Sequence, residues 1–118
     1  MRVKRSVHAR KKRREVLERT KGYRGEANHN YKRAKEALIK AETYAYRDRR
    51  NRKRDFRRLW ITRINAAAKL NGMSYSQFMH GLKLAGVELD RKVLADVAVR
   101  DPETFRRFAE TAREAAAA

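Results

Sequence analysis

The sequence contains no cysteine, only one proline, and less than half as many acidic as basic residues. Without cysteine, the chain can form neither disulfides nor thiolate metal sites. No apolar run approaches the roughly 20 residues that a membrane-spanning helix requires. The basic N-terminus is not followed by the apolar stretch of a secretory signal. These absences predict a soluble, cytoplasmic protein.

The shortage of acidic side chains leaves a large excess of positive charge. The chain has 32 Lys+Arg and 14 Asp+Glu, a formal net charge of +18. On a compact surface this charge repels itself and opposes folding, so an anionic partner is expected. Because 42% of the residues are hydrophobic, the chain is not a wholly disordered polycation. The balance favours nucleic acid or an anionic membrane surface as the partner.

The positive charge is concentrated in the first half of the chain. Residues 1–58 hold 23 Lys+Arg and 7 Asp+Glu, whereas residues 59–118 hold 9 and 7. The first part has too little apolar area to order itself in isolation. The second part is close to the lower size limit of an independent fold. We therefore predict a basic helical extension over residues 1–58 and a small all-helical globular domain over residues 59–118.

Glycine and proline are too sparse to interrupt the chain often. Nothing between Gly25 and Gly72 breaks a helix, and the interval is rich in good helix formers. One long helix is therefore predicted over residues 26–71, and a shorter one over residues 8–21. No clear period-two pattern predicts a strand. The expected fold class is all-α, a long basic N-terminal helical extension followed by a small C-terminal helical bundle.

Helix boundaries are well marked in the second half. Ser74 with Gln77 predicts a capping box, Asp90 predicts a second N-cap, and Asp101 before Pro102 predicts a third. Apolar residues recur between these caps at helical spacing. Those expected to face a common core are Tyr75, Phe78, Met79, Leu82, Val93, Leu94, Val97, Phe105, Phe108, Ala109 and Ala112.

The end of the long helix carries a further apolar stripe, formed by Trp60, Ile61, Ile64 and Ala67. A wall of the C-terminal core is the favoured role, and a protein-binding stripe is the alternative. Gly81 lies inside a predicted helix, where glycine costs about 1 kcal/mol relative to alanine. Close approach of an RNA backbone or of another helix would explain it, and the sequence does not decide between them.

The densest charge is the run from Arg47 to Arg58, in which eight of twelve residues are basic. At 3.6 residues per turn, these side chains point in several directions around the helix. A helix lying on a membrane would instead separate a charged face from an apolar one. Charge on all sides is typical of a rod enclosed by phosphates, as inside folded RNA. A solvated charged helix is the alternative interpretation.

The predicted RNA-binding residues are mostly basic. In the extension they are Arg2, Lys4, Arg5, Arg10, Lys11, Lys12, Arg13, Arg14, Lys21, Tyr23, Arg24, Lys32, Arg33, Arg47, Arg49, Arg50, Arg52, Lys53, Arg54, Arg57 and Arg58. In the second half they are His80, Lys83, Arg91 and Lys92.

Aromatic residues are interleaved with the charge of the extension. They are Tyr23, Tyr31, Tyr44, Tyr46 and Phe56. Such rings stack on unpaired RNA bases, or they pack against nearby apolar residues of the helix such as Leu38. Packing is the favoured role for Tyr31, and both roles stay open for the others.

The sequence lacks the constellations that catalysis requires. His8, His29 and His80 are far apart and have no metal-ligand spacing. Glu88 and Asp90 bracket a turn and resemble capping groups rather than an acid–base pair. There is neither a P-loop nor a dinucleotide fingerprint. We therefore expect that the protein is not an enzyme and that it has no cofactor, no metal and no small-molecule substrate.

Two long segments resemble a known family. They are YRDRRNRKRDFRRLWI from Tyr46 to Ile61 and RINAAAKLNGMSYSQFMHGLKLAGVELDRKVLADVAV from Arg63 to Val99. Both resemble the L-twenty family of bacterial large-subunit ribosomal proteins. The N-terminal RVKRSVHARKKRREVLERTKGYRG fits the same family. The resemblance covers essentially the whole chain.

The resemblance implies a structural constituent of the bacterial large ribosomal subunit. Its extension would thread into 23S rRNA, and the protein would be needed for large-subunit assembly. The resemblance also implies neighbouring ribosomal proteins, L-twenty-one and L-thirteen among them, as partners. In some bacteria the family represses translation of its own operon. A DNA-compacting nucleoid protein and a membrane-active cationic helix remain the competing hypotheses.

Overall fold

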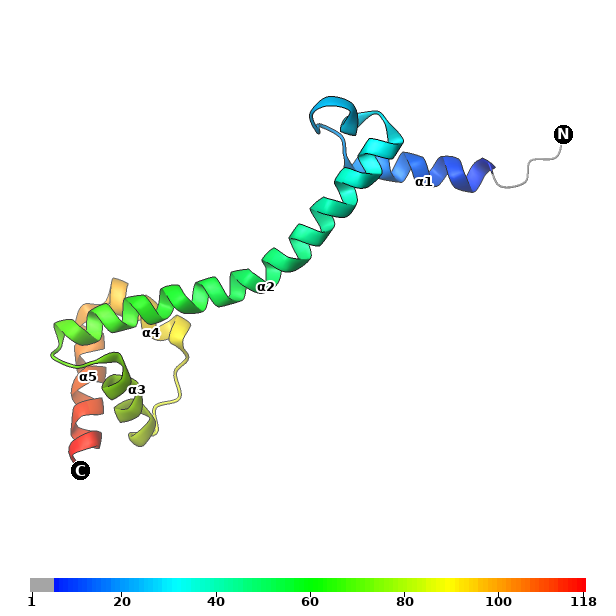
Figure 1. The fold of residues 1–118 in the computed structure, drawn as a ribbon. Helices are drawn as coiled ribbons and strands as arrows, with labels where there is room; N and C mark the ends of the chain where they lie inside the picture. Colours follow the sequence, from blue (N-terminus) through cyan, green and yellow to red (C-terminus); the bar gives the residue numbers. More distant parts are fainter. Residues whose placement is uncertain (1–5) are drawn as a thin grey trace. The chain divides into compact units, whose positions relative to one another are not determined.

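The computed structural model describes residues 6–118, and its regular structure is entirely helical (Figure 1). The elements are α1 (Ser6–Arg19), the 3-10 helix η1 (Gly25–Asn28), α2 (Tyr31–Leu70), α3 (Tyr75–Leu84), α4 (Arg91–Arg100) and α5 (Pro102–Ala117). No strand occurs among residues 6–118, so the all-α prediction is confirmed. The chain forms two compact units, residues 1–50 and residues 51–118, and α2 runs from the first into the second.

The long helix begins later than the sequence predicts. It starts at Tyr31 rather than at residue 26, because residues 25–28 form the 3-10 helix. The Asn30 side chain accepts a hydrogen bond from the Lys32 N–H at 3.2 Å. An asparagine side chain competes for backbone hydrogen bonds in this way and favours a helix start over a helix interior. At its other end α2 stops at Leu70, one residue before the prediction.

The first unit has few buried residues. Thr20 and Ala34 are fully buried, and Leu38 is nearly so. The guanidinium of Arg13 on α1 lies 5.6 Å from the ring centroid of Tyr31 on α2. An ion pair between Arg19 and Glu42 joins the same two helices. Because exposed ion pairs contribute little, these polar contacts add only modestly to the stability of the first unit.

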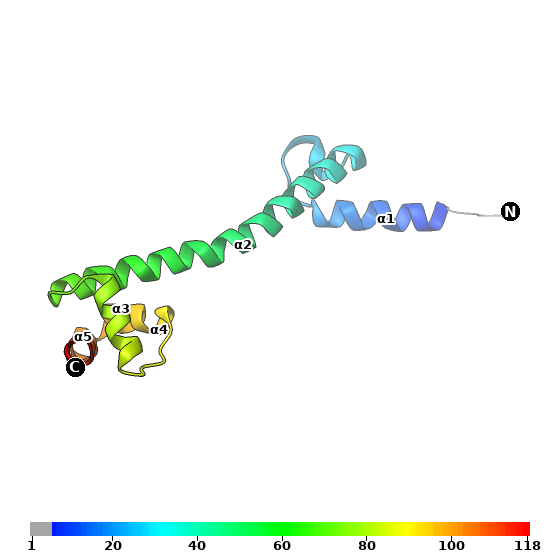
Figure 2. The ribbon, with the colours of Figure 1, turned by 60° about the horizontal axis from the view of Figure 1, so that its bottom comes forward.

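The second unit has a true hydrophobic core. The end of α2 and the helices α3, α4 and α5 contribute its buried residues, Ile64, Ala67, Ala68, Met73, Phe78, Leu82, Leu94, Ala95, Phe105, Ala109 and Ala112. The rings of Phe78 and Phe105 stack with centroids 4.7 Å apart. Figures 1 and 2 show α3 and α5 side by side. The apolar stripe at the end of α2 therefore contributes a wall of this core, as predicted, through Trp60, Ile64 and Ala67. Ile61 is partly buried and is not part of the core cluster, so its placement there was wrong.

Val93 is another exception among the predicted core residues, because it is 42% exposed. The Asp90 cap makes Arg91 the first residue of α4, and the inward face of the helix then carries Leu94 and Ala95. The placement of Val93 in the core was therefore wrong. Tyr75, Met79, Val97 and Phe108 are partly buried and pack against the core, as expected.

The three predicted helix caps are present. Gln77 N–H donates to Ser74 Oγ at 3.2 Å, and Ser74 N–H donates to Gln77 Oε1 at 3.1 Å, which completes the capping box. Asp90 Oδ1 accepts from Val93 N–H at 2.8 Å. Asp101 accepts from the N–H of Thr104, and Pro102 occupies the first turn of α5. These caps set where each helix of the small domain begins.

The neighbour of Gly81 is another helix. A Cβ added at Gly81 would lie 2.7 Å from the Ala112 Cβ and even closer to the Ala112 carbonyl oxygen, both on α5. Real Cβ atoms do not approach other atoms so closely. Glycine is therefore required because α3 and α5 cross with their backbones in contact, which answers the question that the sequence left open.

Candidate nucleic-acid interface

The predicted contacts in the first unit are almost all exposed. Arg2, Lys4 and Arg5 lie outside the described residues. Those on α1, in the connection after it and at the start of α2 are exposed, namely Arg10, Lys11, Lys12, Arg13, Arg14, Lys21, Arg24, Lys32 and Arg33. Tyr23, in the connection, is half-buried. These side chains reach solvent and are available to an anionic partner.

The central basic run lies on α2, and every residue from Arg47 to Arg58 is exposed. Within residues 6–118, the only ion pair of this run joins Arg47 to the adjacent Asp48, at 3.1 Å. The predicted contacts Arg49, Arg50, Arg52, Lys53, Arg54, Arg57 and Arg58 therefore have no carboxylate partner in that part of the chain. Positive charge that is not neutralised within the protein is typical of surfaces that bind phosphates.

Three exposed aromatic rings on α2 stack against arginines of this run. The Arg50 guanidinium lies 3.4 Å from the Tyr46 ring centroid, and that of Arg47 lies 4.6 Å from the Tyr44 centroid. The Arg52 guanidinium lies 5.4 Å from the Phe56 centroid. Because these rings are between 41% and 55% exposed, they are not core residues. Their surroundings leave base stacking open, whereas half-buried Tyr31 lies against α1.

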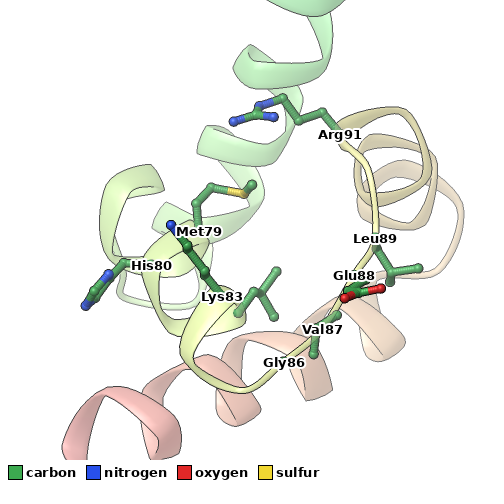
Figure 3. A pocket seen from close by; sticks show the side chains of 9 residues that line it. Met79, His80, Lys83, Gly86, Val87, Glu88, Leu89 and Arg91 are labelled. Atoms are coloured by element: carbon green, nitrogen blue, oxygen red, sulfur yellow. The ribbon is translucent and has the colours of Figure 1, made fainter.

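The small domain has a hollow at the end of α3, and we call it the α3–α4 hollow. Its volume is about 400 Å³, and it is lined by Met79, His80, Leu82, Lys83, Gly86, Val87, Glu88, Leu89 and Arg91. Figure 3 shows that the labelled residues come from α3, from the segment between α3 and α4, and from the start of α4. The hollow thus brings together three of the four contacts predicted in this half, His80, Lys83 and Arg91.

Lys92, the fourth predicted contact, lies in a separate groove. This α2–α4 groove has a volume of about 450 Å³ and is lined by Lys53, Arg54, Arg57, Trp60, Asp90, Arg91 and Lys92. It therefore combines part of the basic run on α2 with the first turn of α4. Arg91 lines both the hollow and the groove.

Two residues of this surface were not predicted as RNA contacts. Tyr75 on α3 accepts a hydrogen bond through its hydroxyl from Arg91 Nε at 2.8 Å. Trp60 on α2 is half-buried at the edge of the core and lines the groove. The sequence predicted both as core residues, because they recur with other apolar residues at helical spacing. Only the packing of α2, α3 and α4 places their remaining surface beside cations.

Metal-ligand clusters and membrane-spanning helices are both absent from the described part of the chain. Residues 6–118 contain no group of three or more His, Cys, Asp or Glu side chains arranged to hold a metal ion. Within the same residues, no helix combines the length and apolar character needed to cross a membrane. Asp90, which the sequence predicted as a helix cap rather than as part of an acid–base pair, caps α4.

A family model described as "Ribosomal protein L20", the L-twenty family, matches residues 2–108. Three curated relatives carry the name "Large ribosomal subunit protein bL20". The relative from Roseiflexus sp. (strain RS-1) is 64% identical over 114 residues, which is 97% of each chain. That from Rhodospirillum centenum is 58% identical over 99% of this chain and 98% of its own. The relative from Thermotoga petrophila is 54% identical over 99% of each.

Proposed function

Because the chain belongs to the ribosomal protein L20 family, whose members are structural components of the ribosome and not enzymes, we propose that it binds 23S rRNA directly and is needed for assembly of the large subunit. The observation that carries the proposal is the exposed basic run on α2, which has a single ion pair among the described residues. Such a surface suits the phosphates of a folded RNA, and membership of a ribosomal protein family supports rRNA as that RNA.

The extension supplies affinity that depends on charge. Each phosphate that a lysine or arginine neutralises releases counterions, so binding weakens steeply as salt increases. Arginine predominates over lysine between Arg47 and Arg58, which favours bidentate phosphate contacts. We propose that residues 1–58 order along the RNA as they bind, so that their helices line phosphates that would otherwise repel one another.

The small domain supplies a rigid, shaped surface. Its caps and close helix packing hold His80, Lys83 and Arg91 around the α3–α4 hollow. Shape and a few polar contacts are the usual means by which proteins recognise folded RNA junctions. We propose that this domain recognises the rRNA site and that the extension then adds affinity over a larger area.

The test compares the full chain with a fragment of residues 51–118, the compact second unit. Binding of both to a 23S rRNA transcript is measured across a salt series, with duplex DNA and anionic vesicles as competitors. The fragment is expected to bind with a smaller salt slope, and DNA is expected to compete poorly. If the fragment is folded but does not bind the transcript, the small domain does not recognise the rRNA site. Equal competition by DNA or vesicles favours the nucleoid or membrane hypothesis.

The role in the ribosome is tested by sedimentation of a cell lysate before and after a high-salt wash. Retention on the large subunit through the wash is expected if the extension is embedded in folded rRNA. Depletion of the protein should then lead to accumulation of incomplete large subunits. Release at modest salt would mean that the charge acts as a generic polyanion binder.

Two finer roles follow from membership of this family. We propose contacts with the ribosomal proteins L-twenty-one and L-thirteen, which exposed apolar side chains such as Leu70, Leu84 and Val99 support. Crosslinking within purified subunits tests these contacts. We also propose that the small domain represses translation of its own messenger where that RNA presents a similar shape. A reporter fused to the messenger leader, with the protein supplied in trans, should lose expression.

A further inference from the structure

We propose that the α2–α4 groove binds one unpaired RNA nucleotide, with its phosphate among the cations of the groove and its base stacked on Trp60. Tyr75 is the positioning residue of this site, because it holds Arg91. This inference depends on the proposed rRNA binding and adds to it a defined subsite, its ligand and two residues that charge alone does not identify.

The cations of the groove converge from two separate parts of the sequence. Lys53, Arg54 and Arg57 come from α2, and Arg91 and Lys92 come from the first turn of α4. Asp90 is the one acidic residue in the lining, and its Oδ1 already accepts the Val93 N–H of the helix cap. Five cations around one cleft repel one another unless an anion lies between them.

These cations are not neutralised by the protein. None of the five forms an ion pair with a carboxylate among residues 6–118. Elsewhere in the second unit the pattern differs, since Arg100 pairs with Asp96 at 2.9 Å and Arg106 pairs with Glu110 at 3.8 Å. Other basic residues of this unit, such as Arg52 and Arg58, also form no ion pair among residues 6–118, so the groove is distinguished by having five such cations around one cleft.

Arg91 is held in place before any ligand binds. Its Nε donates to the Tyr75 hydroxyl at 2.8 Å, and its side chain is half-buried, unlike those of the other four cations. With Nε engaged, the two terminal amino groups remain available. A guanidinium binds a phosphate through two parallel hydrogen bonds, and fixing it beforehand reduces the entropy lost on binding.

Trp60 distinguishes a nucleotide from a simple phosphate. It is half-buried, packs against the core and has Phe56 on one side, with ring centroids 6.2 Å apart. It lines the α2–α4 groove and also a second cavity beside it, distinct from the α3–α4 hollow, which Arg63 and Val93 also line. An accessible indole beside phosphate-binding cations matches how proteins hold splayed RNA bases.

The first test uses Trp60 itself, because it is the only tryptophan in the chain. The full-length protein is titrated with a 23S rRNA transcript while Trp60 emission and its quenching by acrylamide are measured. Heparin and polyglutamate, which carry negative charge but no bases, are the matched controls. We expect rRNA alone to lower the emission and to protect Trp60 from acrylamide.

The outcomes separate this inference from the proposed function. Unchanged Trp60 emission and accessibility in a protein that binds rRNA would overturn the nucleotide site and leave rRNA binding intact. Equal changes with heparin or polyglutamate would also overturn it, in favour of a general anion or an acidic peptide. Absence of any rRNA binding would overturn the proposed function instead.

The second test measures the affinity of full-length variants for the same transcript. Trp60→Leu should lose about tenfold in affinity, and Trp60→Phe, which keeps an aromatic face, should lose much less. Tyr75→Phe should weaken binding about fivefold, since one hydrogen bond to a charged group is lost. Arg106→Gln removes one positive charge outside the groove and is the matched control, with an expected change below about twofold.

A double-mutant cycle separates positioning from a structural role. In an Arg91→Gln background, Tyr75→Phe should cause no further loss of affinity, because the group that Tyr75 holds is gone. Thermal midpoints of all variants are measured alongside. Additive losses, or a loss that parallels a lowered midpoint, would overturn the positioning role of Tyr75.

Discussion

The two units of this protein are built from similar helices and are stabilised in different ways. Of the first unit, the described residues 6–50 bury little beyond Thr20, Ala34 and Leu38, whereas residues 51–118 bury a cluster that includes the stacked rings of Phe78 and Phe105. Most helical stability in proteins comes from packing an apolar face and not from propensity. The second unit therefore contains the hydrophobic core, whereas the first has most of the net positive charge.

The same contrast occurs within one helix. Along α2 the side chains from Arg47 to Leu59 are exposed, whereas Ile64, Ala67 and Ala68 are buried in the small domain. Arg58 and Ile64 are less than two helical turns apart. A single continuous helix thus changes from a charged surface to a part of the core where its sequence changes from arginines to apolar residues at helical spacing.

The largest effect should come from the core of the second unit. Phe78→Ala removes a fully buried ring that stacks on Phe105. We expect a loss of about 3–5 kcal/mol in the free energy of unfolding, because the cavity cannot be filled by neighbours. Chemical denaturation followed by circular dichroism measures this loss. Leu38→Ala in the first unit is the comparison, and an equal loss there would contradict the contrast.

A smaller but still large loss is expected from Gly81→Ala. Alanine is the better helix former, so propensity alone predicts a gain. The added Cβ would instead meet the Ala112 backbone on α5, and such overpacking costs about 1–3 kcal/mol. Thermal melts of Gly81→Ala and of Lys83→Ala, an exposed position on the same helix, measure the difference. Stabilisation by Gly81→Ala would mean that α3 and α5 do not cross so closely.

Charge in the first unit should affect binding and not folding. Arg10→Gln with Arg49→Gln removes two exposed cations that form no ion pair among residues 6–118. The slope of log affinity against log salt for 23S rRNA should fall by about 1.5, since each phosphate contact contributes about 0.7–0.9. Arg100→Gln with Arg106→Gln removes the same charge from the second unit and should change the slope less. Identical slopes for the two pairs would contradict the division of roles.

The smallest expected effect concerns the cap of α5. Hydrogen bonds from the Thr104 side chain and from its backbone N–H lower the pKa of Asp101. A carboxyl with a lowered folded pKa stabilises the fold above its unfolded pKa, and this contribution disappears as the pH falls through the folded value. The thermal midpoint should therefore decrease below about pH 3.9. Asp101→Asn, which caps without titrating, should flatten that part of the pH profile.

Much of the fold could be predicted because its signals are local. The Ser74–Gln77 capping box, the Asp90 and Asp101 caps and the apolar spacing of α3 and α5 lie within a few residues of the atoms they organise. The start of α2 was missed because Asn30 caps it through a single side-chain hydrogen bond. The position of Val93 was missed because small differences in helix phase decide which residue faces inward.

The candidate site divides in the same way. Its charge could be predicted, since a run such as Arg47 to Arg58 is visible in any reading of the sequence. The grouping of its residues could not, because Arg54 and Arg91 meet in one groove only when α4 packs beside α2. The sequence predicted Tyr75 and Trp60 as core residues, and both do pack against the core. Their additional place beside the cations could not be predicted, because it depends on how the helices pack.

By itself, the sequence determined the helical class, the asymmetry of charge and the anionic nature of the partner. These properties follow from composition and from interactions between residues close along the chain. The tertiary structure alone decided why Gly81 must lack a side chain, that Tyr75 holds Arg91, and that Trp60 lies among cations. Each of these depends on atoms from different helices, and their distances are set by packing and not by spacing along the chain.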